Sequence, residues 1–292
     1  MSALVQKFGR LLALPDHLNF DPQREAQTRN GVVVEGKWWI INPLTDVVIG
    51  DGKLNHAPKN FALMWDSFRA GLYQSGLQTG DPTTTFRTYN GTAGLRVDIT
   101  LPEHDFNHAL GDASCLKIRY VDSHDQSSRL SIRAMVMVFW SMNGQISMRD
   151  NTSLNYLHTN FVNSEPIAKV ASTWHEYLLK DCADMRRMKG IRVSREKAIH
   201  FYSTYVASSS TLTGPVVNKA MLDRIMGIHD SYSDLHDTVF RMYNVLTHMS
   251  THVESKSCAT KKQLVMEDKI SSIIKGDAFK ELVHDYGTPS VQ

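Results

Sequence analysis

The chain has 292 residues, of which 42% are hydrophobic and 21% charged, a composition that excludes a disordered chain, a collagen-like repeat and a disulfide scaffold. Its 32 lysines and arginines nearly balance 30 acidic residues, so the net charge of +2 neither requires nor forbids a nucleic-acid partner. Three widely separated cysteines, Cys115, Cys182 and Cys258, indicate free thiols in a reducing compartment.

Residues 1–30 are predicted to form an N-terminal arm that begins with a short helix. The apolar run at its start contains Lys7 and Arg10 and is followed by no small-residue cleavage site, which favours an amphipathic helix over a signal peptide. No segment approaches the roughly 18 apolar residues that a membrane span needs. We therefore expect a cytoplasmic protein without a membrane partner.

Residues 31–163 are predicted to form a β-rich core domain. A first hairpin turns at Asn42-Pro43, and a helix with a buried aromatic stripe follows it from Phe61 to Leu72, ending near Gly76. Successive strands joined by tight turns are typical of an antiparallel meander and disfavour a parallel nucleotide-binding fold. The strands are expected at residues 32–34, 38–42, 47–50, 83–89, 95–101, 116–122, 130–140 and 145–148.

Residues 164–286 are predicted to form a helical region, because the hydrophobic period changes there to about 3.6 residues. Ser164 and Ser194 are expected to cap its first two helices. The predicted fold class is α+β, with an antiparallel β-meander and a packed helix in the N-terminal half and a mostly helical C-terminal half. The remaining elements are expected to be a Ser/Thr-rich loop at 208–214, helices from Pro215, around 239–253 and within 261–283, and a disordered tail at 287–292.

Signatures of common catalytic sites are missing from the sequence. It contains no glycine-rich phosphate loop, and Leu179 stands where a zinc-protease helix that begins at His175 needs its second histidine. His104 and His108 lie four residues apart, but they have no evident third metal ligand. We therefore predict neither a metal site nor a cofactor.

The segment Ser123-His124-Asp125, preceded by Asp122, contains the residue types of a hydrolytic triad. Sequence neighbours on a strand point to opposite faces, whereas a triad must converge in space. The same segment is typical of a polar turn between two strands. A turn is therefore favoured, and a metal-dependent nuclease or other hydrolase that uses Asp122, His124, Asp125 and His158 stays an alternative.

Basic residues follow the alternating pattern of the predicted strands. Lys117 and Arg119 share one strand face, Arg87 and Tyr89 share another, and Arg96 lies opposite its apolar neighbours. Neighbouring strands would combine these residues, together with Arg133, into a basic solvent face. Such a face suits a nucleic-acid backbone, with Tyr89 available to stack a base.

A second basic cluster follows the first predicted helix of the C-terminal half. Short runs of this kind can contact phosphates, although an ordinary solvated face has the same composition. The cluster consists of Arg186, Arg187, Lys189, Arg192, Arg195 and Lys197, with only Glu196 opposed.

Residues 121–128 (VDSHDQSS) and the later segment 141–144 (SMNG) resemble the signature of the phage/plasmid-like family called domain of unknown function 932. The family pattern reads approximately N-S-H-D-G-S-S, an apolar strand, then C-x-N. Residues 158–159 and 238–247 are similar to its K-H-T and T-x-W-x-x-Y-N-A-x-T motifs. The predicted hairpin at 38–51 and helix at 60–76 also fit its N-terminal layout, so the resemblance spans most of residues 38–282. Asp122, Gln126 and Ser141 depart from the family's Asn, Gly and Cys. The family has no assigned reaction, and the resemblance implies a mobile genetic element in a bacterial host.

The predicted order of elements also resembles the core of phage single-strand annealing proteins of the RecT, Redβ and Erf kind. This resemblance implies a homo-oligomeric ring or filament that binds single-stranded DNA and anneals it in recombination, without a nucleotide cofactor or covalent catalysis. The hydroxyl and backbone N–H groups of the 123–128 turn could donate to phosphates. The residues expected to bind nucleic acid are Arg87, Tyr89, Arg96, Lys117, Arg119, Ser123, His124, Ser127, Ser128, Arg133, Arg186, Arg187, Lys189 and Arg192.

A third hypothesis is a protein–protein module that acts on a host factor. Met135, Met137 and Met142 could form an adaptable contact surface, although methionine also fills gaps in cores.

Overall fold

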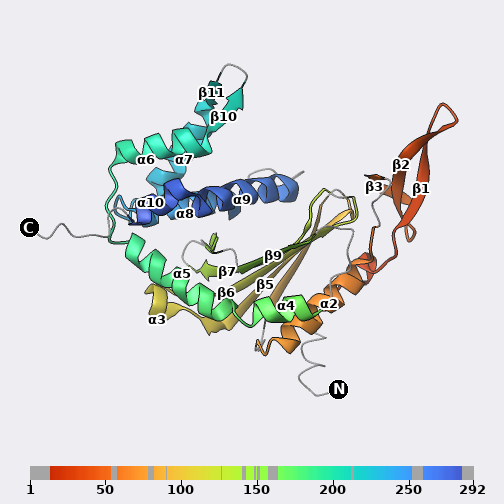
Figure 1. Cartoon of the computed structure of the whole chain (residues 1–292), viewed down its shortest axis with the longest axis horizontal. Helices are drawn as coiled ribbons and strands as arrows, with labels where there is room; N and C mark the ends of the chain where they lie inside the picture. The colour runs from red at the N-terminus through yellow and green to blue at the C-terminus, as the bar shows by residue number, and fades with distance from the viewer. Residues whose placement is uncertain are drawn as a thin grey trace, which may run out of the picture. The chain divides into compact units, whose positions relative to one another are not determined.

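The computed structural model describes residues 14–53, 58–77, 82–89, 91–125, 127–139, 143–147, 149, 152–156, 164–211, 214–251 and 259–284. It confirms the α+β class, with antiparallel sheets in the N-terminal half and helices toward the C-terminus (Figure 1). The chain forms two compact units that interleave along the sequence rather than dividing at residue 163. Unit 1 comprises residues 1–105, 115–135 and 150–177, and unit 2 comprises residues 106–114, 136–149 and 178–292.

A three-stranded antiparallel sheet opens unit 1, in the order β1 (Gln23–Arg29), β2 (Val32–Asn42) and β3 (Val47–Lys53). The β2–β3 hairpin was expected, whereas β1 was not, because it lies within the predicted N-terminal arm of residues 1–30. The side chains of β1 are mostly exposed. Such a strand needs few apolar residues, so an alternating hydrophobic pattern does not reveal it. Asn30 and Gly31 both have positive φ, as the tight turn from β1 to β2 requires.

Helix α2 (Phe61–Gln74) begins as expected, with the Asn60 side chain accepting a hydrogen bond from the Ala62 backbone N–H. Its predicted aromatic stripe is buried, and Trp65 meets Tyr120 edge-on at a ring-centroid distance of 5.2 Å. The helix also packs closely on α4 (Ser164–Ala171), because a Cβ at Gly71 would lie 2.6 Å from the Ile167 side chain.

The larger sheet of unit 1 is the predicted antiparallel meander. Its strands follow the order β4 (Thr83–Tyr89), β5 (Gly94–Asp105), β6 (Ser114–Ser123) and β7 (Leu130–Val138). A strand that the sequence did not indicate, β9 (Ser153–Tyr156), pairs with β7. In unit 2 the last residues of β7 pair with β8 (Asn143–Gln145), which replaces the strand expected at 145–148.

The helices differ from expectation mainly in where they break. The helix predicted to begin at Ser164 is divided into α4 and α5 (Trp174–Met188). The last predicted helix is divided at Gly276 into α9 (Ala259–Lys275) and α10 (Asp277–His284). Ser194 caps α6 (Arg195–Phe201) as expected, and a short π-helix, η3 (Tyr202–Val206), extends it. The other described helices are η1 (Asp16–Leu18), α3 (Asn107–Leu110), α7 (Lys219–Ser231) and α8 (Val239–Thr251).

The segment expected to be a Ser/Thr-rich loop is a hairpin of β10 (Ser208–Thr211) and β11 (Gly214–Val217). Pro215 therefore lies on a strand, and the following helix begins only after Asn218, whose side chain accepts a hydrogen bond from the Met221 backbone N–H. Ser, Thr and Gly are compatible with either structure, so composition alone could not separate the two.

The core of unit 2 surrounds α8, which is buried along almost its whole length. Its polar residues are satisfied internally. The Tyr243 hydroxyl donates to the Ile146 carbonyl, and the Gln145 amide donates to Asn244 at 3.1 Å. Among the helices that the structure describes, none has both the length and the apolar character to cross a membrane. The expected tail at 287–292 lies outside the described residues.

Two of the three cysteines can be placed, and both are buried free thiols, as the sequence indicated. Burial raises the pKa of Cys115 to about 11 and that of Cys182 to about 12. Neither thiol is therefore a nucleophile near neutral pH. Cys258 lies outside the described residues.

We expect Gly71→Ala to destabilise the protein by about 1–3 kcal/mol, because the added methyl group must displace Ile167 or the Ser164 backbone. Gly227→Ala is the matched control, since Gly227 is also helical and a Cβ there meets nothing within 4 Å. The control should be neutral or more stable by up to about 1 kcal/mol. Urea unfolding followed by far-UV circular dichroism measures both; equal stabilities of the two variants would contradict the close α2–α4 contact.

Candidate nucleic-acid interface

The sheet of β4, β5 and β6 has one aromatic and one cationic face. Tyr120, on the aromatic face, packs on α2 and is paired with Val97 across the sheet. The other face is defined by the alternating residues, among which Arg96 pairs with Arg87 and Asp98 pairs with Arg119. We call this side the cationic face; its charged residues in the regularly paired part are Arg87, Arg96, Asp98, Lys117 and Arg119.

Asp98 is the centre of the cationic face. Its carboxylate accepts hydrogen bonds from Arg96 Nη2 and Arg119 Nε, each at 2.7 Å, and Lys117 Nζ lies 3.8 Å away. Burial alone would raise the pKa of Asp98, but the charges of Arg119, Arg96 and Lys117 hold it well below its ordinary value. Asp98 therefore stays ionised and fixes the positions of three cations.

The strand alternation predicted correctly which residues share this face, but the expectation that all of them reach solvent is wrong. Arg96 and Arg119 are each only 2% exposed, and the Lys117 side chain is 12% exposed. The physical reason is Asp98, because a carboxylate among the three cations makes their burial tolerable. Alternation identifies a face but does not say whether that face is covered.

The edge strand β4 is the exposed part of the cationic face. Thr83, Thr85 and Arg87 alternate along it, and all three are exposed. Tyr89, in contrast, is buried, so its ring is not presented for stacking as expected. Its hydroxyl donates to the Asp122 carbonyl and is hydrogen-bonded to Ser128 Oγ.

Arg133 lies on β7 and is half-buried, with its Nε donating to Ser131 Oγ at 3.2 Å. Its place on the solvent face was expected, and part of the side chain does remain accessible. The structure therefore leaves Arg87 as the most open of the five cations predicted on the sheet.

The 123–128 segment is the predicted turn between β6 and β7. Ser123 Oγ donates to the Ser128 carbonyl and accepts from the Ser128 N–H, while Asp125 accepts from the Ser127 N–H. His124 is fully buried and stacks on Phe61 at a centroid distance of 3.7 Å. These side chains hold the turn against the rest of unit 1.

The described residues of the hydrolase alternative form no metal site. The Asp122 carboxylate accepts from the Tyr120 hydroxyl at 3.2 Å and therefore lies on the aromatic side of the sheet. His158 lies outside the described residues, and within the described ranges no three His, Cys, Asp or Glu side chains gather as a metal site. His104 and His108 lie on different elements, β5 and α3.

The second basic cluster lies in unit 2 and is more neutralised than its sequence suggested. Lys189 pairs with Asp112 at 2.7 Å, Arg187 pairs with Asp184, and Arg195 binds Asp230 with both terminal nitrogens. The expectation that only Glu196 opposes the cluster is therefore wrong, because the other acids come from distant or neighbouring segments. Arg186 donates a long hydrogen bond to the His108 carbonyl, and Arg192 is exposed.

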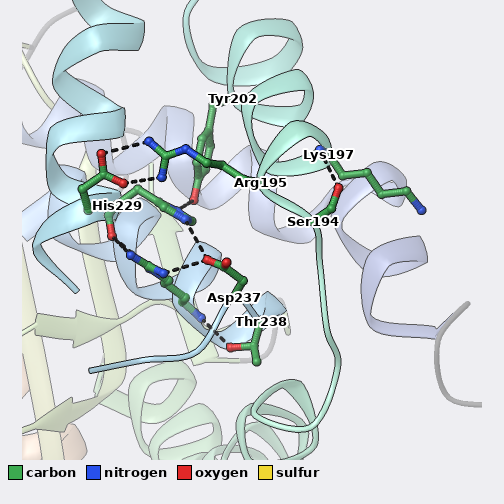
Figure 2. A network of polar contacts seen from close by, with 9 residues as sticks. Ser194, Arg195, Lys197, Tyr202, His229, Asp237 and Thr238 are labelled. Carbon is green, nitrogen blue, oxygen red and sulfur yellow. Dashed lines mark hydrogen bonds and ion pairs between the residues drawn. The ribbon is translucent and has the colours of Figure 1, made fainter. Parts of the chain in front are cut away.

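Figure 2 shows the polar network that surrounds Arg195. Tyr202 is hydrogen-bonded to His229 Nδ1 at 3.1 Å, and Arg241 donates to the His229 carbonyl and to Asp237. Burial, followed by the charge of Arg241, lowers the pKa of His229, which favours the neutral ring. The Tyr202–His229 hydrogen bond joins η3 to α7, and Arg241 joins α7 to α8. Because Tyr202 is 0% exposed, it offers no nucleophile to a substrate.

No known protein family, curated protein or solved structure matches the chain. Function must therefore be argued from the chemistry of the side chains and their placement.

We expect Asp98→Asn to destabilise the protein by about 3–5 kcal/mol at neutral pH, because buried cations lose their shared carboxylate. The depressed pKa of Asp98 means that its contribution is present above about pH 4 and is lost as the pH falls below that value. The difference from wild type should therefore shrink in acid.

The matched control for Asp98→Asn is Asp66→Asn, which removes an ion pair with Arg69 from a carboxylate that is 66% exposed. It should cost less than about 1 kcal/mol. Denaturant unfolding at several pH values measures both variants, and a cost at Asp98 no larger than at Asp66 would contradict the central role of Asp98.

Proposed function

We propose that the protein binds single-stranded nucleic acid, DNA in the first place, at the β4 edge of the cationic face. The observation that supports this most directly is the exposed row of Thr83, Thr85 and Arg87. Its members share one face and are spaced by about 7 Å along the strand, an interval similar to that between phosphates of an extended nucleic-acid strand. Hydroxyl and guanidinium groups are common donors to phosphate oxygens.

Arg96 on β5 and Lys117 and Arg119 on β6 would attract a nucleic acid through their electrostatic field rather than by direct contact. Four cations and one acid occupy the regularly paired part of the cationic face, so its net charge is positive. Because Asp98 fixes Arg96 and Arg119 in place, their positive charge needs no rearrangement when an anion arrives. Phosphate contacts of this kind carry no base sequence information, which suits a protein that handles any single strand.

The activity proposed for this binding is annealing to a complementary strand in recombination, without covalent catalysis or a nucleotide cofactor. The resemblance of residues 121–128 to the phage/plasmid-like family supports the biological setting of a mobile element. Arg186, Arg187 and Arg192, which are exposed in unit 2, are proposed as a second set of phosphate contacts. The alternatives are a metal-dependent nuclease and a module acting on a host protein. The DNA-binding assay below distinguishes the nuclease, because a nuclease would cleave the oligonucleotide.

We expect the affinity for a labelled single-stranded DNA oligonucleotide to fall steeply as salt rises, in proportion to the phosphates neutralised. Arg87→Gln should weaken binding several-fold and reduce the slope of log affinity against log salt by about 1. Thr85→Val should weaken binding less, because it removes one neutral donor. Fluorescence anisotropy across a salt series measures all three proteins.

Lys169→Gln is the control for these variants, since Lys169 is an exposed cation on α4 of the same unit, and it should leave both affinity and slope unchanged. Salt-independent binding by the wild type, or equal losses in Arg87→Gln and Lys169→Gln, would reject the proposed edge. Cleavage of the oligonucleotide that requires Mg²⁺ would instead favour the nuclease.

A further inference from the structure

Two histidines from separate, incomplete sequence motifs lie together in unit 1. Sequence spacing paired His104 with His108 and His175 with position 179, and neither pair completes a metal site. In the structure the rings of His104 and His175 approach each other instead, with their centroids 6.1 Å apart and their planes inclined by 60°. His104 lies near the end of β5, and His175 lies in the first turn of α5. The fold therefore joins two candidate ligands that are far apart in the sequence.

The backbone of β5 explains why His104 takes part in this contact. The regular pairing of β5 with β6 stops at Leu101 and resumes only at Asp105, so residues 102–104 have no paired residue. A bulged segment of this kind turns a strand out of its regular pattern and re-aims a side chain. Pro102, which has no backbone N–H to donate, is compatible with a break in the ladder at this point. The position of the His104 ring is thus set by the bulge rather than by the strand alternation.

The distance between the two rings suits two ligands of one metal ion. In a zinc site each imidazole nitrogen lies roughly 2.0–2.1 Å from the metal, and the ring centroid lies roughly 1 Å farther along the same line. Two such rings therefore have centroids roughly 4.5–6.5 Å apart, for angles at the metal between about 90° and 180°. The observed 6.1 Å lies within that interval.

The surroundings of the pair favour a cation. His175 is exposed and His104 is half-buried, so solvent reaches both rings. Their neighbours in sequence include three exposed acids, Glu103, Asp105 and Glu176. The first basic residue of α5 is Lys180, one turn beyond Glu176. Acids therefore outnumber bases close to the two rings, which raises the local concentration of divalent cations.

We propose that His104 and His175 bind a transition-metal dication of the class of Cu²⁺, Ni²⁺ and Zn²⁺ and so join the bulge of β5 to the first turn of α5. Imidazole nitrogen is a preferred ligand of these ions, whereas Mg²⁺ and Ca²⁺ prefer oxygen. Among the residues that the structure describes, no group of three His, Cys, Asp or Glu side chains forms a metal site, so water would fill the other positions. Affinity should follow the general order for divalent ions, with Cu²⁺ bound most tightly.

The test is pulsed electron paramagnetic resonance of the full chain, purified without a histidine tag, freed of metal by a chelator and loaded with one equivalent of Cu²⁺. Echo modulation by the remote imidazole nitrogens counts the histidines on copper, because two bound imidazoles give combination lines that a single one does not. Wild type should show two. His104→Asn and His175→Asn should each show at most one, and each should weaken the binding of Zn²⁺, measured by calorimetry, at least tenfold.

His108→Asn is the matched control, because His108 is exposed, lies on α3 and is the histidine nearest to His104 in sequence. It should leave the number of imidazoles on copper and the affinity for Zn²⁺ unchanged. Because a metal that binds the native state stabilises it, saturating Zn²⁺ should raise the midpoint of thermal unfolding of wild type and of this control. The same addition should not raise the midpoint of His104→Asn or His175→Asn.

Fewer than two imidazoles on copper in wild type, or equal losses of affinity in all three variants, would mean an adventitious ion only and would overturn the proposal. The wild-type spectrum decides the matter even where a variant fails to fold. Competition by Mg²⁺ against Zn²⁺ would also contradict a site built from imidazole nitrogen. The inference does not rest on nucleic-acid binding, because neither histidine belongs to the cationic face or to the second basic cluster. Metal binding can therefore succeed while DNA binding fails, and the reverse result is equally readable.

Discussion

The larger sheet of unit 1 depends on one buried carboxylate. Asp98 holds Arg96 on its own strand and Arg119 on the neighbouring strand, while Lys117 lies within 4 Å. A slip of β5 by one residue would move Arg96 and Asp98 onto the side where α2 packs its aromatic stripe. The cost of burying unpaired charges there would be several kcal/mol. The network therefore specifies the register that separates the aromatic face from the cationic face.

The sequence predicted the faces of the sheet more reliably than their exposure. Strand alternation placed Arg87, Arg96, Lys117 and Arg119 together, since side-chain direction is a local property of the backbone. Whether a face is covered depends on segments far away in the chain. Asp98 could have been recognised from the same alternation, because it lies two residues from Arg96 and directly across from Arg119. An acid at that position indicates that the neighbouring arginines form ion pairs within the protein and do not all face solvent.

Two strands, β1 and β9, were not predicted from the sequence, because their formation also depends on segments distant in the chain. β1 has mostly exposed side chains, and β9 has only four residues, so neither produces a hydrophobic pattern that stands out from a loop. Both exist because a partner strand offers backbone hydrogen bonds, at β2 and β7. By contrast, the bounds of α2 were predicted closely. Its N-cap and its apolar stripe all lie within 15 consecutive residues, so its signal is local.

The 123–128 turn illustrates how reactive residue types can serve packing. His124 stacks on Phe61, and Tyr89 fills the space above Gly94, where a Cβ would lie 2.1 Å from its ring. Asp125 approaches Gly50 so closely that a Cβ there would lie 2.4 Å away. A Ser-His-Asp sequence can thus be specified by the need to anchor β6, β7 and β3 to one another, without any chemistry.

The cationic face of unit 1 combines buried charges with one exposed edge, and this arrangement bears on how it could bind a partner. The cationic face carries four cations against one acid, so two copies placed face to face there would repel each other. Arg96 and Arg119 are buried and are held by Asp98, whereas Arg87 is exposed on the edge strand β4. A polyanion on this face would therefore contact the β4 edge directly and would meet the buried cations only through their electrostatic field.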